Sequence, residues 1–280
     1  ECSVLWRIFK FYARYAMMLK HKRKRMSKRI IVIPDTQCAP GQDFTFLSWI
    51  GKYIADKKPD VIVQIGDFAD MESLSSYDVG KKSFEGRSYT ADIKAAHEAM
   101  DYLMIPILKE RVRLENNKKK RWNPRMVLTL GNHEHRIDRA IENDRKLEGL
   151  ISLYDLNYEE NWEVYPFLQP VVVEGICFSH YLCSGVMGRP ITTARMLLTK
   201  KHMSCIVGHQ QGRDVAYSHR ADGRAITAII AGSCYQHNES YLNHQTNEHW
   251  RGILLLNEIG DGTIDECFVS LNYLKAKYGS

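Results

Sequence analysis

The chain has 280 residues, 44% of them hydrophobic and 26% charged, a composition typical of one globular domain with a sizeable core. Its seven cysteines show no paired spacing, which excludes a zinc ribbon or a thiol-redox motif and indicates free thiols in a reducing, cytoplasmic compartment. The net charge of +6 is compatible with a phosphate-bearing partner such as a nucleic acid, without establishing one.

The first 25 residues differ from the rest in their mixture of apolar and basic side chains. They are too short and too charged for a transmembrane span. They fit either an amphipathic helix on a membrane surface or an extension ahead of the folded core. We favour the extension, because the first apolar strand begins at Ile30. The predicted organisation is a basic extension over residues 1–25 and a single domain over residues 26–280.

The first half of the chain alternates short apolar runs with stretches of helical periodicity. We expect strands at 30–33, 61–65 and 126–130, and helices at 45–58, 91–115 and 136–151. Pro106 predicts a break or kink in the second helix. Units of strand, helix and strand form parallel sheets with right-handed crossovers.

The second half is richer in hairpins. The expected elements are a hairpin at 171–173 and 176–178, a helix beginning at Pro190 and ending at Lys201, strands at 205–207 and 227–231, and a terminal hairpin of 252–258 and 263–271. Together the two halves predict an α/β fold in which two mixed sheets pack together with helices outside.

Five apolar runs end in side chains that can bind metal. The five endings are Asp35-Thr36-Gln37, Gly66-Asp67-Phe68-Ala69-Asp70, Gly131-Asn132-His133-Glu134, Ser179-His180 and Gly208-His209-Gln210-Gln211. Ligand chemistry in α/β folds collects at the carboxyl ends of strands. Any one of these residues has an ordinary explanation as a cap or a buried histidine, but five such endings in one chain indicate a single site.

This ordered series resembles the signature of the metallophosphoesterase superfamily, the calcineurin-like phosphoesterases. That signature runs Asp-x-His, Gly-Asp-x-x-Asp, Gly-Asn-His-Glu/Asp, a lone His and Gly-His-x-His, and the likeness spans about residues 28–260. Gln37 and Gln211 depart from it, since each stands where the family has a histidine. The resemblance implies a four-layer αββα sandwich of two mixed β-sheets flanked by helices.

The resemblance also implies two divalent metal ions bridged by Asp67. A pair of ions about 3.5–4 Å apart binds phosphoryl oxygens and acidifies a shared water. Besides Asp67, the family pattern gives one ion Asn132, His180 and His209, and the other Asp35, Gln37 and Gln211. Amide oxygens suit Mn²⁺ or Mg²⁺, so we expect one of these at the glutamine-containing position and Zn²⁺ or Fe at the histidine-containing one.

The family's general acid corresponds to His133, which would protonate the leaving oxygen. Asp70 would accept a hydrogen bond from that imidazole and orient it. Arg136, one turn further on, is either a ligand for the substrate phosphate or an ordinary surface arginine.

The stretch Ser233–Arg251 holds three histidines and several aromatic residues without clear periodicity. One interpretation is a substrate-binding loop whose aromatics stack on a base, with His237 as the first candidate contact. The other is a loop pinned by its own aromatic side chains, and the sequence does not separate them.

We therefore expect a phosphoesterase that attacks a phosphodiester or nucleic-acid-like substrate with a metal-bound hydroxide. One alternative is a phosphomonoesterase acting on nucleotides or phosphoproteins. The other is a non-catalytic module that binds phosphate or nucleic acid through a decayed metal site marked by the two glutamines. Retention of His133 argues against decay, because a binding module needs no general acid.

Overall fold

The structure is a computed structural model that describes residues 28–279 except 77–79, 81–83, 237–248 and 261. The predictions for residues 1–25 and for His237 therefore lie outside the described residues. Among the residues described, no helix is both long and apolar enough to cross a membrane.

The first sheet has six strands in the order β13-β12-β1-β2-β3-β4. Strands β1 to β4 run parallel to one another, whereas β12 is antiparallel to both β1 and β13. The strands are β1 Lys28–Ile33, β2 Val61–Gln64, β3 Arg125–Thr129, β4 Glu163–Tyr165, β12 Gly252–Gly260 and β13 Thr263–Ser270.

The second sheet has five strands in the order β10-β11-β9-β6-β5. Its centre is parallel, since β9 runs alongside β6 and β11 in the same direction, and its two edges are antiparallel. The strands are β5 Val171–Val173, β6 Ile176–Ser179, β9 Cys205–Val207, β10 Arg213–His219 and β11 Ala225–Ala231, and a separate hairpin pairs β7 Cys183–Ser184 with β8 Arg189–Pro190.

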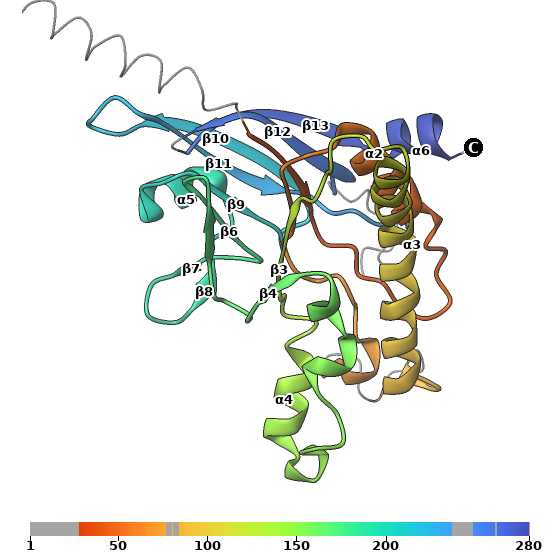
Figure 1. Ribbon diagram of the computed structural model, residues 1–280. Coiled ribbons are helices and arrows are strands. Elements are labelled where there is room, and N and C mark those ends of the chain that lie inside the picture. Colours follow the sequence, from red (N-terminus) through yellow and green to blue (C-terminus); the bar gives the residue numbers. More distant parts are fainter. Residues whose placement is uncertain (1–27, 77–79, 81–83, 237–248, 261, 280) are drawn as a thin grey trace, which may run out of the picture.

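Figure 1 shows the two sheets with helices outside them. Three clusters of buried apolar side chains hold these layers together. Along β1, alternate side chains point to opposite faces: Ile31 and Ile33 pack under the helices, and Ile30 and Val32 pack against the second sheet. Helices α2 (Thr45–Lys57), α3 (Tyr89–Asn116) and α6 (Leu271–Tyr278) cover the first sheet, and α5 (Ala194–Lys201) covers the second. The predicted αββα sandwich of two mixed sheets is confirmed.

Helix α3 continues past Pro106, so the predicted break is absent, and the alternative of a kink stays a prediction. Its Leu103 carbonyl and the Pro106 ring lie directly against Gly51 of α2, where a Cβ would collide with the Leu103 oxygen. The small residue lets the two helices approach closely, and packing of this kind stabilises a helix that local propensity alone would interrupt.

Two predicted helix boundaries were wrong. Helix α4 spans Arg136–Asn143 and stops well before Ile151, because the side chain of Asp144 accepts the Lys146 N–H and starts a separate 3₁₀ turn. Helix α5 begins at Ala194 rather than at Pro190, which lies in β8. Its cap is Thr193, whose hydroxyl accepts the Met196 N–H at 3.2 Å.

Candidate metal centre

Strand ends from both sheets meet at one place. Asp35 follows β1, Asp67 follows β2 and His209 follows β9, and hydrogen bonds join their loops. The N–H groups of Thr36 and Gln37 donate to the Asp67 carbonyl at 3.0 and 2.9 Å. Across the sheets, the His209 N–H donates to the Asp35 carboxylate at 3.1 and 3.2 Å. The predicted convergence of polar strand ends is thus present in the fold.

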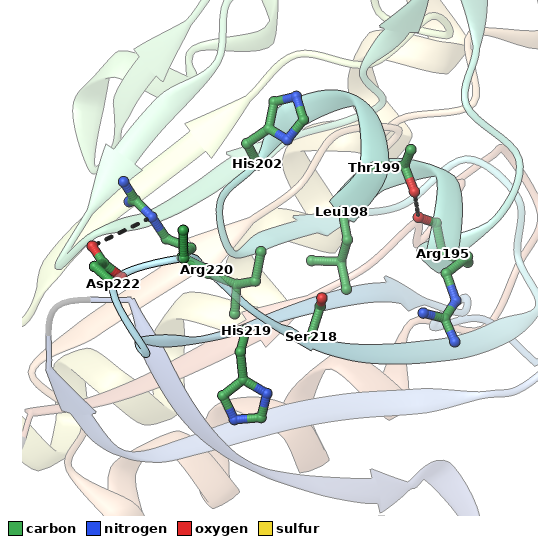
Figure 2. Close-up of a pocket in the computed structure, with 10 residues that line it drawn as sticks. Arg195, Leu198, Thr199, His202, Ser218, His219, Arg220 and Asp222 are labelled. Atoms are coloured by element: carbon green, nitrogen blue, oxygen red, sulfur yellow. Dashed lines mark hydrogen bonds and ion pairs between the residues drawn. The ribbon is translucent and has the colours of Figure 1, made fainter.

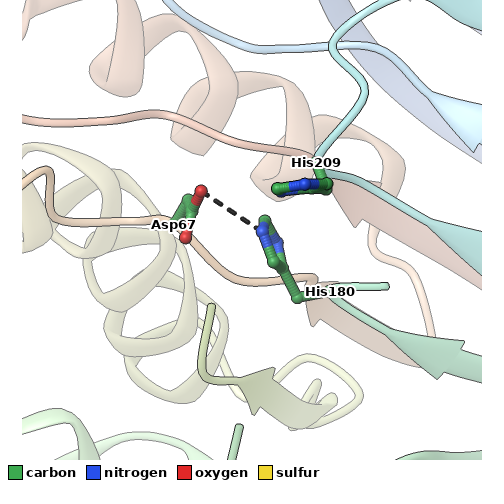
Figure 3. Close-up of side chains that lie close together, drawn as sticks. All are labelled: Asp67, His180 and His209. Atoms are coloured by element: carbon green, nitrogen blue, oxygen red, sulfur yellow. Dashed lines mark ion pairs between the residues drawn. The ribbon is translucent and has the colours of Figure 1, made fainter. Parts of the chain in front are cut away.

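The histidine-containing position is compact. One ligand atom from each of Asp67, His180 and His209 lies within 4.8 Å of the others, a spacing that a metal ion fits. Figure 3 shows Asp67 and His180 facing each other with His209 beside them. His180 Nε2 lies 3.2 Å from Asp67 Oδ2 and 2.9 Å from Asn132 Oδ1. Its Nδ1 lies 3.1 Å from the Ile65 carbonyl, which favours the tautomer that leaves Nε2 to a metal.

The glutamine-containing position is arranged differently. Asp35 and Gln37 are buried beside Asp67, but the side chain of Gln211 lies against Tyr235. The Tyr235 hydroxyl donates to Gln211 Oε1 at 2.9 Å and lies 2.9 Å from His249 Nδ1. That Gln37 and Gln211 bind a metal stays a prediction.

The predicted acid lies beside this centre. His133 Nδ1 is 2.6 Å from Asp70 Oδ1, the contact that an orienting carboxylate requires, and the His133 N–H donates to Asp67 Oδ1 at 2.9 Å. Arg136 is not a free surface arginine: its guanidinium donates to the Asp70 carbonyl at 2.8 Å and lies 3.2 Å from His133 Nε2. Whether it also binds a phosphate stays a prediction.

Sequence reasoning gave no role to Glu134, which is fully buried under the site. Its carboxylate accepts the N–H groups of Asp67 at 3.1 Å, Ala69 at 3.0 Å and Gly131 at 2.8 Å. The side chain therefore clamps the loop after β2 to the loop after β3. A carboxylate three residues after a strand-ending glycine is a signal for such a clamp, because that spacing lets it fold back onto the glycine N–H.

The backbone is strained at four of the predicted metal ligands. The φ angles are 43° at Gln37, 51° at Asp67, 68° at His209 and 59° at Gln211, a left-handed region that residues with a Cβ rarely adopt. Strain of this kind persists when surrounding contacts hold it, and it clusters at functional sites. Gln37 and Gln211 therefore have the same left-handed backbone as Asp67 and His209.

Two glycines leave room for the carboxylates of Asp67 and Asp35. A Cβ on Gly131 would collide with the carboxylate of Asp67, and one on Gly208 would collide with that of Asp35. These positions need glycine for close approach, which explains the glycines that begin the third and fifth strand endings.

The charges of the site are strongly coupled. Burial raises the pKa of Asp35 to about 7. Burial acts the same way on Asp67, but the neighbouring His133 and His180 outweigh it and hold the pKa of Asp67 well below its usual range. Burial disfavours the imidazolium of His180, but the charge and hydrogen bond of Asp67, together with the charges of Asp35 and Glu134, outweigh it and raise the pKa of His180 to about 9. Burial and the nearby His180 lower the pKa of His209 to about 4.

Burial and neighbouring carboxylates also oppose each other in setting the pKa of His133, the predicted acid. Burial disfavours the imidazolium of His133, but Asp67 and Asp70 outweigh it and raise the pKa. A proton held at higher pH than in an ordinary histidine suits a general acid.

The sequence profile of the calcineurin-like phosphoesterases matches residues 28–222, which cover the five strand endings. The chain belongs to this family. Its members hydrolyse phosphate esters with a dinuclear metal site, and the carboxylates, imidazoles and amide gathered here are a donor set that fits such ions.

Individual proteins match different shares of the chain. The Gene 54 protein of Mycobacterium phage L5 is 47% identical over 57 residues, which are 20% of this chain and 22% of the phage protein. The protein TT1561 of Thermus thermophilus is 12% identical over 87% of this chain and 99% of its own, with a TM-score of 0.30. Another solved structure is 13% identical over 88% of this chain and 100% of its own, with a TM-score of 0.36.

A cavity of about 600 Å³ lies elsewhere, between α5 and the strands β10 and β11 (Figure 2). Arg195 lies at one end and Arg220 at the other, where it is 3.8 Å from Asp222. None of the predicted site residues lines it. The chemistry of the strand ends therefore does not extend into this cavity.

Proposed function

We propose that this protein is a metal-dependent phosphoesterase that hydrolyses a phosphodiester or nucleic-acid-like substrate. The observation that carries the proposal is the place of Asp67. Its buried carboxylate lies 3.2 Å from His180 Nε2 and 3.6 Å from His133 Nε2, and its backbone carbonyl accepts the Gln37 N–H at 2.9 Å. One residue therefore contacts a proposed ligand of each metal position and the proposed acid.

The residues of the histidine-containing position would hold the first ion: Asp67, Asn132, His180 and His209. Asp35, Gln37 and Gln211 would share Asp67 to hold the second. When bound, such ions neutralise phosphoryl oxygens and lower the pKa of a water. Oxygen donors from the amides favour Mn²⁺ or Mg²⁺ at the second position, and imidazoles favour Zn²⁺ or Fe at the first.

His133 supplies the proton for the leaving oxygen. Asp70 anchors its Nδ1 at 2.6 Å, so the proton that moves is the one on Nε2. Arg136 Nη2 lies 3.2 Å from the same Nε2. A guanidinium there lowers the proton affinity of the imidazole when the transfer occurs, and its remaining donors can meet a phosphate oxygen.

The two alternative functions would require different features of the site. A phosphomonoesterase would use the same residues on a more highly charged ester. A decayed binding module would still need Glu134 to hold the two loops together, but it would have no use for the contact between His133 and Asp70. The preference for a diester rests on the modest basic charge and stays a proposal, as does a cytoplasmic location, which the six free cysteines of the described residues support.

Hydrolysis assays separate the three functions. Protein supplied with Mn²⁺ is expected to cleave bis(p-nitrophenyl) phosphate faster than p-nitrophenyl phosphate, and chelation is expected to stop both reactions. A preference for the monoester would support the phosphomonoesterase instead. No cleavage of either ester with Mn²⁺, Mg²⁺ or Zn²⁺ would overturn the proposal.

A further inference from the structure

A series of rings leads away from the metal centre. The His209 ring lies 4.9 Å from the Tyr181 ring. Tyr181 meets Phe167 edge-to-face at 5.4 Å and 82°, and Phe167 is stacked on His135 at 4.8 Å and 27°. We call Tyr181, Phe167 and His135 the ring row, with His209 at its metal end. None of the metal or acid roles described above uses these three side chains.

The ring row belongs to the same edge of the sandwich as the site. Tyr181 directly follows His180 at the end of β6, His135 lies two residues beyond His133, and Phe167 lies on the crossing between β4 and β5. The row therefore collects side chains from three separate segments at the strand ends. All three are half-buried rather than enclosed, and the His135 side chain is 35% exposed.

The row is held in place at its far end. His135 Nδ1 lies 3.1 Å from Asp138 Oδ2, one turn along α4, and this contact fixes the plane of the imidazole against Phe167. Rings that are partly open and fixed in orientation provide stacking surfaces, and their polar edges distinguish them from an aliphatic groove. A planar heterocycle fits them better than a peptide or an acyl chain does.

We propose that the ring row binds a nucleobase of the substrate, so that a phosphodiester linked to a nucleoside lies with its phosphate at the metal centre and its base against the partly exposed surface of the row. This inference rests on the proposed function and narrows it to nucleoside-bearing phosphodiesters. Stacking accepts any base, because every base has a π-face, so the row favours nucleic acid without selecting a sequence.

Two esters with the same leaving group test the inference. Thymidine 5′-(p-nitrophenyl phosphate) carries a base, and methyl p-nitrophenyl phosphate does not. The unmodified protein should favour the thymidine ester in kcat/KM. Phe167→Leu should reduce that preference by about 5- to 100-fold, the range expected for one lost stacking contact, and leave the methyl ester within about twofold.

Further variants separate stacking from simple packing. Phe167→Trp should keep the preference, since it retains a stacking face, and Tyr273→Leu, which removes an exposed ring on α6, should change neither ester. Activity on the methyl ester reports that each variant is folded. An unchanged preference in a Phe167→Leu protein that still cleaves the methyl ester would overturn the inference.

A binding measurement keeps this result distinct from failure of the proposed function. Chelator-treated protein is titrated with a fluorescent eight-residue oligothymidylate, which needs no hydrolysis. Weaker binding by Phe167→Leu than by Tyr273→Leu would support the ring row even if no ester were cleaved. Equal binding by the two variants would contradict it.

Discussion

The two halves of the candidate metal centre differ in what surrounds them. At the histidine-containing half, His180 Nε2 lies 2.9 Å from Asn132 and 3.2 Å from Asp67, so the donor atoms already face one another. At the glutamine-containing half, the Gln211 amide is hydrogen-bonded to Tyr235 at 2.9 Å. Both departures from the family signature fall in this half, where Gln37 and Gln211 each stand in place of a histidine.

We propose that this difference reflects an asymmetric centre rather than a decayed one. A neutral amide oxygen is a weaker ligand than an imidazole for zinc or iron, yet it suits Mn²⁺ and Mg²⁺. The glutamines also keep the left-handed backbone of the metal-ligand loops, at 43° for Gln37 and 59° for Gln211. The two amides thus lie on backbone of the same left-handed kind as Asp67 and His209.

The largest expected effect comes from Asp67, which the two halves share. Asp67→Ala should reduce hydrolysis to background, a loss on the order of 10⁴-fold or more, because both positions lose a ligand. Metal analysis should show less bound metal. Asp265→Ala, on the distant strand β13, is the matched control and should retain both. Full activity in Asp67→Ala would rule out its bridging role.

The next effect concerns His133, which lies outside both positions. His133→Ala should keep the bound metal but lose about 10²–10⁴-fold in kcat on esters with poor leaving groups. A nitrophenolate needs little protonation as it leaves, so nitrophenyl esters should lose less. Equal losses on the two kinds of ester would contradict the acid role.

The glutamine half can be tested by restoring imidazoles. The double variant Gln37→His with Gln211→His should bind Zn²⁺ about 10- to 100-fold more tightly at that position, comparable with known effects of ligand environment. Tyr235→Phe in the unmodified background removes the hydroxyl from Gln211 and serves as a control for disturbance of the loop. Unchanged Zn²⁺ affinity in the double variant would mean that these positions do not contact the metal.

The smallest effect is a pH dependence of stability. The pKa of His180 rises from 6.5 to about 9 in the folded, metal-free protein. The folded state therefore binds this proton more tightly than the unfolded state, and the stabilisation is complete below pH 6.5 and lost as the pH rises toward 9. The raised pKa of Asp35 acts in the same direction up to about pH 7.

Urea unfolding in chelator should thus show a falling free energy of unfolding between pH 7 and 9. Added Mn²⁺ competes with the proton on His180. The stabilisation by Mn²⁺ should therefore grow as the pH rises from 7 to 9. His202→Gln, at an exposed position beyond α5, should leave the slope unchanged. His180→Gln should reduce it, and the remainder comes from His133, whose pKa is also raised. The same falling slope in His180→Gln would show that another group is responsible.

How much of this could be read from the sequence depends on where each signal resides. Strands such as β1 and β2 were predictable because a central strand buried on both faces is a continuous apolar run. Strand β10 was missed because it lies at the sheet edge with exposed polar residues from Arg213 to His219. The three-residue edge strand β4 and the terminal helix α6 were missed as well.

Some residues of the site could also be predicted from the sequence, and others could not. Ligand types at strand ends are local, so Asp67 and His180 could be named in advance. The role of Glu134 depends on backbone N–H groups of another loop, which composition does not reveal. Tyr235 was a candidate for base stacking, but the structure buries it completely, and within the described part of Ser233–Arg251 the aromatics pin the segment instead.

The most direct test of the asymmetric centre is calorimetric titration of the chelator-treated protein with Zn²⁺ and, separately, with Mn²⁺, followed by metal analysis. We predict two binding events of unequal affinity: a tight ion at the position of Asn132, His180 and His209, and a weaker one, best filled by Mn²⁺ or Mg²⁺, at the position of Asp35, Gln37 and Gln211. Hydrolysis should rise as the weaker position fills. Two equally tight zinc ions in the unmodified protein would contradict the account.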